Sequence, residues 1–312
     1  MKKNYKNILI LIILLLILIY YLFNNNLIIN NVLDYSKLFL TRLFPVSFIF
    51  YIIIGLLIDY GIIEFMSNIL HINTTNLFVY LISMLSGFPS GSKYTKDLLN
   101  KGIIDLDSAN KMIMYSHFPN PLFILSSLNM IIKNKYIIKN ILISIILSNL
   151  IIMIIFSNKN KFSNNNIYSN DFSTNLVKEI NNSFKTMFII YGTSLFFDLI
   201  SSMILKIFKL KGFYYIIICG LFDLTRGIYS TIIISNNYLR GLLILLFISM
   251  GGISIHLQTK SILADTGIKY KYFVQGRIIG TILCIIIYFI LTSCTTLNII
   301  YRTDYIYTIS SW

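Results

Sequence analysis

The sequence has few charged residues, and acidic residues are the scarcer kind. Charged residues make up 12% of the 312 positions, with 12 Asp and Glu against 26 Lys and Arg. Hydrophobic residues make up 56%, and the mean hydropathy is +0.75. This composition excludes an ordinary soluble globular domain and predicts a protein of the lipid bilayer.

Motifs of enzymes and metal proteins are also missing. The sequence contains no Gly-x-Ser-x-Gly, Cys-x-x-Cys, His-Glu-x-x-His or P-loop pattern. Its three cysteines, Cys219, Cys284 and Cys294, stand in apolar stretches without metal-like spacing, which favours packing residues. We therefore expect no enzyme, no metal and no cofactor. An intramembrane enzyme built from scattered Ser, His and Asp is the weaker alternative.

The net charge of +14 raises the question of a nucleic-acid partner. No basic stripe with interleaved aromatic residues occurs outside the apolar segments, which argues against one. Lysines gather instead in short connections between apolar runs, as is typical of cytoplasmic loops beside anionic lipid. These are Lys133, Lys135 and Lys139, then Lys206, Lys209 and Lys211, then Lys260, Lys269 and Lys271. The expected partners are the bilayer and a small-molecule anion, and a homo-oligomer is left open.

The first apolar run, Ile8 to Phe23, approaches the roughly 20 residues that span hydrocarbon. Lysines precede it, but no small-residue cleavage site follows, so we predict an uncleaved helix with a cytoplasmic N-terminus. The Asn-rich stretch from Asn24 to Ser36 carries no Lys or Arg before Lys37 and is predicted to be an external connection. Residues 1–36 thus form an N-terminal unit, and a second span runs from Leu38 to Asp59.

Four clusters of small and polar residues interrupt the later apolar segments. They are Ser86 to Ser92, Ser116 to Pro121, Gly220 to Gly227 and Gly251 to His256. The last two follow the first two at the same offset in the sequence, and full spans flank each pair. The order predicts an all-α polytopic membrane protein, with an N-terminal helix and two repeated units that contain discontinuous, half-membrane helices. Lysine positions do not decide whether the repeats are parallel or inverted.

The predicted boundaries follow from the same pattern. The first repeat covers 37–157, a polar linker 158–182, the second repeat 183–300 and a C-terminal tail 301–312. Inside the first repeat, the charged connector from Lys93 to Tyr115 is predicted to form one or two short surface helices, with helix-start chemistry at Asp105.

The broken segments of the first repeat supply candidate substrate-binding residues, because irregular backbone within lipid needs protection by protein or water. They are Ser86, Gly87, Pro89, Ser90, Gly91, Ser92, Asn120 and Pro121. A helix N-terminus after Pro89 would present amides and hydroxyls to an anion. Asn120 either contacts the ligand or caps the next half-helix. His117 is either a turn residue, which is the commoner case beside prolines, or a group that titrates during transport.

The second repeat supplies a further set. They are Asp223, Thr225, Arg226, Gly251, Gly252, Ser254, His256 and Gln258. Asp223 and Arg226 are expected to share a helix face and neutralise each other, either as a structural pair or with Arg226 in contact with a substrate carboxylate. Asp198, an acid within an apolar run, is a candidate for binding a coupling cation. It can equally be a buried protonated acid or face water.

Several of these motifs, in this order, resemble the YlbJ sporulation integral membrane proteins. They are Ser-Gly-Phe-Pro-Ser-Gly-Ser at 86–92, Asn-Pro-Leu-Phe-Ile at 120–124, Gly-Leu-Phe-Asp-Leu-Thr-Arg-Gly at 220–227 and Gly-Gly-Ile-Ser-Ile-His-Leu-Gln at 251–258. The resemblance covers roughly Leu77 to Arg277. It departs at Ser92, where alanine is common, and at His117 to Pro119, where small polar residues are usual. Such proteins belong with the nucleoside-recognition or gate domain proteins.

The resemblance implies a role in endospore formation, in the mother-cell membrane that surrounds the forespore. It also implies movement of dipicolinic acid, a small planar dianion. Half-helix ends and Arg226 would hold its carboxylates, and Asn120 or Gln258 would contact the ring nitrogen. We therefore expect a multi-pass cell-membrane transporter of a small anionic metabolite, most simply dipicolinic acid. The alternatives are a nucleoside or nucleobase carrier and a membrane scaffold that transports nothing.

Overall fold

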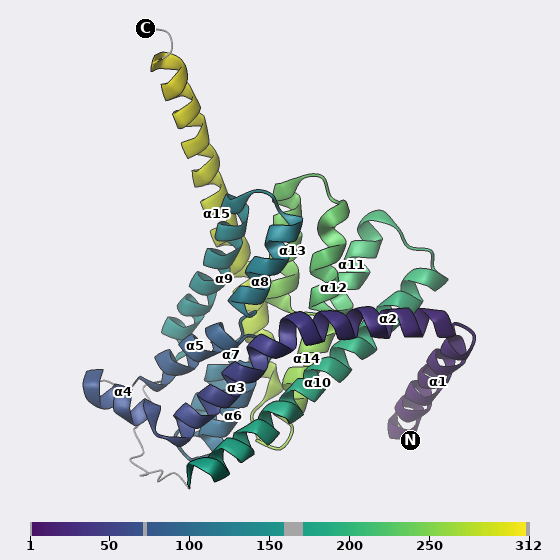
Figure 1. The fold of residues 1–312 in the computed structure, drawn as a ribbon, viewed down its shortest axis with the longest axis vertical. Coiled ribbons are helices and arrows are strands. Elements are labelled where there is room, and N and C mark those ends of the chain that lie inside the picture. The colour runs from purple at the N-terminus through teal and green to yellow at the C-terminus, as the bar shows by residue number, and fades with distance from the viewer. Residues whose placement is uncertain (1, 71–73, 159–170, 310–312) are drawn as a thin grey trace.

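A computed structural model describes residues 2–70, 74–158 and 171–309, and every regular element in these ranges is a helix. Four helices are long and apolar enough to cross a membrane, or six spans if two bent helix pairs each count as one. The predicted all-α polytopic membrane fold is confirmed. Figure 1 shows a bundle, with the N-terminal helix at its side and the C-terminal helix projecting beyond its upper end.

The N-terminal unit contains one more helix than predicted. Helix α1 (Lys2–Leu22) is followed by α2 (Asn25–Leu38), which turns away from it by 96°. A π-helical turn, η1 (Phe39–Leu43), then leads into α3 (Phe44–Asp59). The prediction of a connection from Asn24 to Ser36 is therefore wrong. Its Ile and Leu residues recur at helical spacing, and packing of that apolar side outweighs the weak helix propensity of the asparagines.

The rest of the first half consists of short helices and one long one. They are α4 (Ile62–Leu70), α5 (Thr75–Ser86), α6 (Ser90–Asn100), α7 (Leu106–Tyr115), α8 (Pro121–Ile131) and α9 (Lys135–Phe156). Helix α7 starts as predicted, since the Asp105 carboxylate accepts a hydrogen bond from the Ser108 amide at 2.8 Å. Helices α6 and α7 are not surface helices, however. Most of their residues are buried, and α7 packs against α9 and α15.

The second half begins earlier and ends later than predicted. It comprises α10 (Phe172–Ile207), α11 (Gly212–Phe222), α12 (Leu224–Ser230), η2 (Thr231–Ile233), α13 (Asn237–Met250), α14 (Ile253–Ile262) and α15 (Tyr270–Ile309). Helix α10 starts inside the predicted linker because Asp171 caps it through the Ser173 amide. Residues 159–170 of that linker lie outside the described residues. Helix α15 continues through the predicted tail to residue 309, and residues 310–312 are also outside the description.

The two halves repeat the same order of elements in opposite directions. Helices α5 to α9 correspond in order to α11 to α15. In Figure 1, α6 and α7 lie toward the lower end of the bundle and α12 and α13 toward the upper end. The contacts are reciprocal: α6 packs on α14 as α12 packs on α8, and α7 packs on α15 as α13 packs on α9. These positions and contacts are those expected of two halves that are inverted relative to each other.

This inversion also bears on the interpretation of the lysine groups. The connection between α8 and α9 lies at the upper end of the bundle in Figure 1, and that between α14 and α15 at the lower end. Lys133 and Lys269, which belong to these two connections, are thus on opposite sides. An inverted duplication would place corresponding loops on opposite faces of the membrane, so the cytoplasmic assignment of all three lysine groups stays a prediction.

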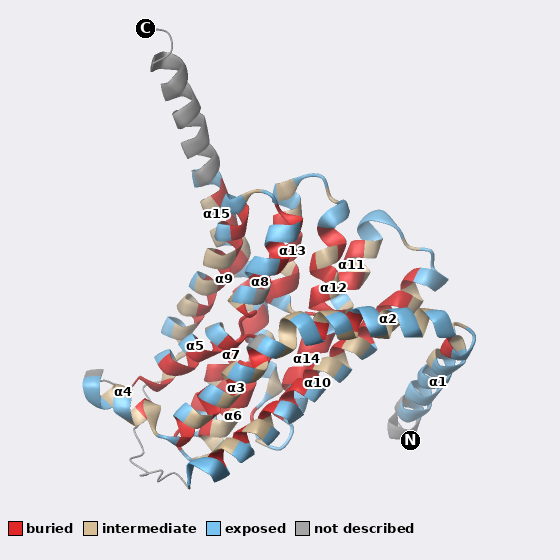
Figure 2. Cartoon of the chain, viewed as in Figure 1, coloured by how far each residue is buried: buried red, intermediate tan, exposed pale blue. Residues whose placement is uncertain are grey.

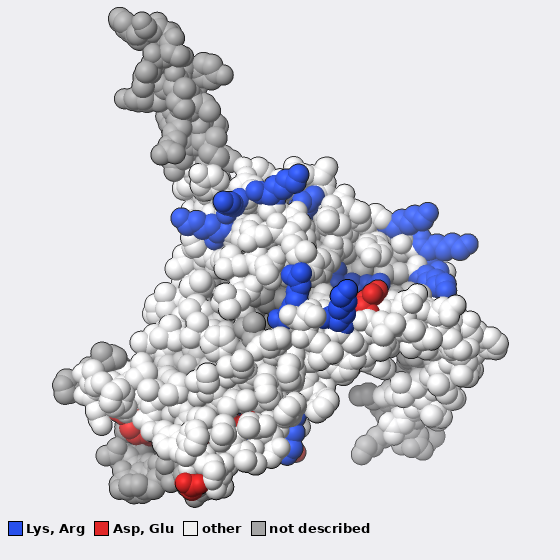
Figure 3. All heavy atoms as spheres, viewed as in Figure 1, with Lys and Arg blue, Asp and Glu red and all other residues white. Residues whose placement is uncertain are grey.

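The exposed surface of the bundle is largely apolar. Figure 2 shows buried residues gathered over α6, α7, α13 and α14, whereas α1 is exposed along most of its length. On α3, the exposed side chains Ile49, Ile53 and Leu57 follow one another at one-turn spacing. Figure 3 shows basic residues along the upper and right edges and in one central group, with a wide uncharged area below that group. Such a surface suits contact with lipid chains.

Candidate functional site

Three of the four helix breaks, and the helix that follows the fourth, meet at one small pocket, which we call the central pocket. Its volume is about 60 Å³. Phe88, Asn120 and Asp223 line it from the first three breaks, and Gln258 lines it from the helix that follows the fourth. Helices α3 and α10 close it from the side, with Ser194 of α10 among the lining residues. Both repeats thus contribute polar groups to the same small space.

Glycine and proline create the breaks. Helix α5 ends at Gly87 and helix α13 at Gly251, with φ angles of 81° and 74°. Glycine adopts this left-handed backbone without the steric cost that a side chain brings, and it commonly ends helices for that reason. Pro121 then opens α8, where its missing amide hydrogen sacrifices no helical hydrogen bond. Local sequence chemistry therefore determines where the half-helices start and stop.

Other glycines let the two breaks of each half touch through their backbones. A β-carbon on Gly91 would overlap the carbonyl oxygen of Ser116, and one on Gly252 would come within 3.1 Å of the carbonyl oxygen of Phe222. These two predicted site residues are therefore required for close packing. Neither lines the central pocket.

We expect Gly91→Ala to destabilise the protein strongly, because the added methyl group meets backbone atoms that cannot move independently. The matched control is Gly192→Ala in α10, where a β-carbon meets nothing within 4 Å. Replacing glycine by alanine inside a helix stabilises it by about 0.5–1 kcal/mol. Thermal unfolding of both purified variants in detergent tests this. Equal melting temperatures would show that the two breaks do not pack as described.

Asn120 meets both expectations from the sequence. Its Oδ1 accepts a hydrogen bond from the Leu122 amide at 2.9 Å, which caps α8. Its Nδ2 donates to the carbonyl of Leu85 at 3.2 Å, near the end of α5. The side chain also lines the central pocket. One residue thus joins two half-helix ends and presents an amide to the pocket, so the capping and ligand-binding alternatives are compatible.

Asp223 is the acidic group of the central pocket. It is buried, and it caps α12 because its Oδ2 accepts a hydrogen bond from the backbone amide of Arg226 at 3.1 Å. Its Oδ1 accepts from the Ser254 hydroxyl at 3.1 Å. Across the pocket, Gln258 Nε2 donates to the Ser194 hydroxyl at 3.0 Å. These bonds connect the third break to α14, and α14 to α10.

The Arg226 side chain points away from the central pocket and pairs with Asp198. Its Nη1 lies 2.7 Å from Asp198 Oδ1 and 2.5 Å from the Ser202 hydroxyl on α10. The predicted neutralisation of Asp223 by Arg226 is wrong, because the Asp223 carboxylate is engaged in capping the helix. Asp198 has the partner that its sequence context did not reveal. Its proposed role in cation binding stays a prediction and would require this ion pair to open.

Apart from Thr225, the remaining predicted residues do not line the central pocket. The Ser86 hydroxyl donates to the Ile82 carbonyl, and the Ser92 hydroxyl lies 3.0 Å from His117 Nε2. His256 contacts the Tyr270 hydroxyl at 2.6 Å and the Met250 carbonyl at 3.0 Å. Pro89, Ser90, Pro121 and Gly251 shape the breaks instead. Thr225 does line the pocket, beside Asp223.

One functional residue was missed from the sequence. Arg277 on α15 is 2% exposed, and its guanidinium donates to the carbonyls of Met114 and His117 at 3.2 Å and of Ser249 at 3.4 Å. It also donates to Asn149 Oδ1 at 3.1 Å. A cation therefore stands at the C-terminal ends of both α7 and α13, where helix dipoles favour positive charge. An arginine at the start of an apolar span was the available signal.

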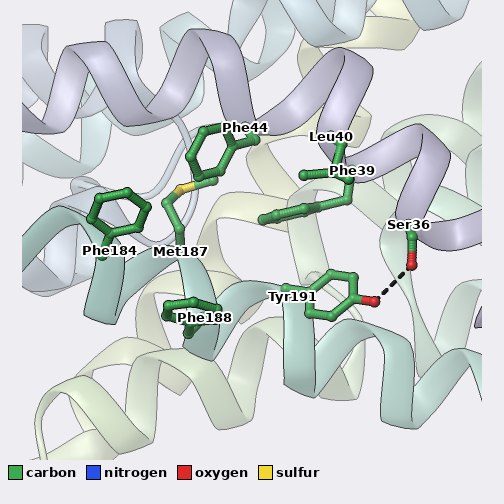
Figure 4. A pocket seen from close by; sticks show the side chains of 8 residues that line it. All are labelled: Ser36, Phe39, Leu40, Phe44, Phe184, Met187, Phe188 and Tyr191. Carbon is green, nitrogen blue, oxygen red and sulfur yellow. Dashed lines mark hydrogen bonds between the residues drawn. The ribbon is translucent and has the colours of Figure 1, made fainter.

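A separate apolar groove lies between η1 and α10. Its volume is about 360 Å³, and Phe39, Phe44, Phe184 and Phe188 are among its lining residues. Figure 4 shows side chains of α2, η1 and α3 on one side and of α10 on the other, with one hydrogen bond of 2.7 Å between the Ser36 and Tyr191 hydroxyls. A groove with this lining suits apolar chains and offers little to a polar solute.

No known protein family, curated protein or solved structure matches this chain. In residues 2–70, 74–158 and 171–309, no three His, Cys, Asp or Glu side chains gather as metal ligands would. Function therefore has to be argued from the central pocket, from the inverted halves that build it and from the motif resemblance.

Proposed function

We propose that this protein is a membrane carrier of a small polar metabolite, and that dipicolinic acid is its substrate during endospore formation. The observation that carries the proposal is the meeting of three helix breaks, and of the helix that follows the fourth, at one small pocket to which both halves contribute polar groups. Discontinuous helices that meet between inverted repeats are the usual substrate sites of secondary transporters. A membrane scaffold has no need for such a pocket.

The central pocket is too small for such a metabolite in this conformation. Its volume of about 60 Å³ is well below the roughly 300–1,000 Å³ of small-molecule sites. Substrate binding therefore requires the half-helices to separate. Each broken pair can move as a unit because its two breaks are packed backbone to backbone. Rocking of one half against the other would expose the pocket to alternate sides.

The hydrogen-bond donors of Asn120, Thr225 and Gln258 suit carboxylate oxygens and a ring nitrogen. An ionised Asp223 would repel such a dianion. The proposal therefore includes uptake of dipicolinate together with a proton carried by Asp223. Transport into proteoliposomes should accordingly be faster when the side that holds the substrate is the more acidic one.

A nucleoside or nucleobase carrier is the second candidate, and one observation favours it. The charged group among the residues that line the pocket is an acid, and its other polar groups are amides and hydroxyls. Such a lining suits an uncharged ligand with both donors and acceptors. Uptake of labelled dipicolinate in competition with uridine separates the two proposals, because only the true substrate should block transport at low concentration.

The test of the central site uses two residues on α14. Gln258→Leu removes a pocket amide, and we expect uptake to fall by roughly tenfold to a hundredfold, the effect of losing one or two buried hydrogen bonds. His256→Gln is the matched control, since His256 faces Tyr270 and does not line the pocket. Equal uptake by the two variants would place the substrate elsewhere. If neither dipicolinate nor uridine raised the melting temperature of the purified protein, the scaffold interpretation would replace the carrier.

A further inference from the structure

A second polar cavity lies below the central pocket, between α3, α6, α10 and α14, and we call it the lysine cavity. Its volume is about 480 Å³, within the roughly 300–1,000 Å³ of small-molecule sites. Five lysines line it, namely Lys93, Lys96, Lys101, Lys178 and Lys185, against two acids, Asp97 and Glu179. Positive charge therefore exceeds negative charge in the lining.

Part of this charge is already compensated. Asp59, at the end of α3, pairs with Lys101 and lies 3.2 Å from the Lys178 ammonium. Lys96 donates to the carbonyl of Ile262 at 3.1 Å. With Asp59 included, the cavity and its border still carry more lysines than carboxylates. An oxyanion in this space would meet several ammonium groups, and the attraction is strongest beside Lys93, whose side chain is the most buried of them.

Lys93 occupies the innermost position. Its side chain is 7% exposed, and the nearest carboxylate oxygen, Glu179 Oε2, is 3.5 Å away. Neither Lys93 Nζ nor Glu179 Oε2 has a hydrogen-bond partner among the described residues. An ammonium has three donors, and leaving them unused in a buried site is costly. Lys93 therefore retains the capacity to bind a carboxylate or phosphate oxygen.

The lysine cavity and the central pocket follow one another along the same helix faces. On α10, Thr186 lines the lysine cavity and Ile190, one turn further on, lines the central pocket. On α14, Ser261 lines the lysine cavity and Gln258, three residues earlier, lines the central pocket. Residues three or four apart share one side of a helix, so the two spaces lie end to end.

Tyr51 of α3 lies between them. It is fully buried, and its hydroxyl donates to the carbonyl of Phe88, a lining residue of the central pocket, at 3.2 Å. The Lys93 ammonium lies 5.5 Å from the centre of its ring, on the side of the lysine cavity. Tyr51 thus contacts one lining residue of each space, Phe88 of the central pocket and Lys93 of the lysine cavity.

We propose that the lysine cavity binds small anions with carboxylate or phosphate groups, with Lys93 as the inner ligand and Tyr51 as the barrier before the central pocket. The binding of anions stands on the cavity alone. Its place on the route to the central pocket rests on the proposed carrier function. The same oxyanion chemistry is present in free solutes and in lipid headgroups, which the experiment must separate.

Acidic pH should strengthen binding at this site. Burial raises the pKa of Asp97 to about 6, although Lys93, Lys101 and Lys178 oppose the shift and Glu179 adds to it. Between pH 7 and pH 5 Asp97 loses its negative charge, and the cavity becomes more positive. Affinity for anions should rise over this range in the native chain and change less in Asp97→Asn.

The test measures binding of dipicolinate and of inorganic phosphate to the full chain in nanodiscs of zwitterionic lipid. We expect Lys93→Gln to weaken the affinity roughly tenfold or more, since a charge-assisted hydrogen bond is lost. Lys139→Gln, an exposed lysine on α9, is the matched control. Because Lys93→Gln removes the ammonium beside Glu179 Oε2, the double variant Lys93→Gln/Glu179→Gln checks that any loss is not misfolding. Equal affinity of these variants and the control would overturn the proposal.

Two further results test the anion-binding site and the proposed carrier function separately. Anion binding that depends on Lys93, without any uptake into proteoliposomes, would reject the carrier and leave the binding site standing. Uptake that is indifferent to Lys93→Gln, with unchanged anion affinity, would reject the site and leave the carrier standing. Repeating the titration in nanodiscs that contain phosphatidylglycerol identifies the source: competition by this lipid assigns the site to headgroups, and its absence assigns the site to free anions.

Discussion

Asp198→Asn and Arg226→Gln are each expected to lose most of the folded protein, whereas the double variant Asp198→Asn/Arg226→Gln should recover it. The two side chains form an ion pair of 2.7 Å, with the carboxylate 9% and the guanidinium 24% exposed. Removing one partner of a buried pair costs about 3–5 kcal/mol, because the other charge is left uncompensated. We expect the lower end of that range, since the Arg226 side chain is partly exposed. Replacing both charges leaves two neutral groups able to hydrogen-bond.

Thermal unfolding and yield of monodisperse protein in detergent measure this cycle. Arg42→Gln is the control, because Arg42 is only partly buried and its guanidinium contacts the Met130 sulfur at 3.5 Å. Uptake by the double variant decides between two roles. If the double variant folds and transports, the ion pair serves to stabilise the packing of α12 on α10. If Arg226→Gln alone is as stable as the native chain yet inactive, Arg226 contacts substrate as the sequence predicted.

The positions of the half-helices could be predicted because their signals are local. Gly87 and Gly251 end helices through a backbone conformation that glycine adopts most easily, and Pro121 starts one. Asp105 caps α7 through an amide three residues away. Each signal lies within a few residues of the boundary that it sets. The duplication added a second observation of the same order, which is why the broken segments could be found without a structure.

The partners of the charged residues could not be predicted, since they depend on packing between distant elements. The acid nearest to Arg226 in the sequence is Asp223, but its carboxylate caps α12. The Arg226 guanidinium instead pairs with Asp198 on α10. The burial of α6 was hidden for a related reason. Its serines, threonine and lysine have the composition of a surface helix, and only the surrounding helices supply their environment.

The inverted halves also show how one duplicated scaffold produces an asymmetric site. Helix α6 starts after Pro89 and helix α12 after Asp223, at corresponding places in the two repeats. Proline offers no side-chain acceptor, whereas the aspartate caps its helix and brings a carboxylate to the central pocket. The repeated backbone creates the opening between half-helices, and the substitutions within it determine which ligands fit.

Arg277→Gln is expected to destabilise the protein by about 3 kcal/mol or more. The guanidinium satisfies four acceptors, three of them carbonyls at the C-terminal ends of α7 and α13. Each buried acceptor left without a donor costs about 1–3 kcal/mol, and the favourable interaction with two helix dipoles is lost as well. The stability of Arg277→Lys should lie between those of the native chain and Arg277→Gln. An ammonium keeps the charge, but it lacks the planar fork that reaches all four acceptors.

Lys271→Gln is the matched control, since it removes an exposed cation from the same helix. The melting temperature of Arg277→Gln should lie roughly 10 °C below that of the control, given about 2–4 °C for each kcal/mol in a protein of this size. The breaks before Asn120 and Ser254 follow the helix ends that Arg277 holds, so its loss should also slow transport. Native stability of Arg277→Gln together with lost affinity for dipicolinate would instead make Arg277 a substrate ligand that this conformation conceals.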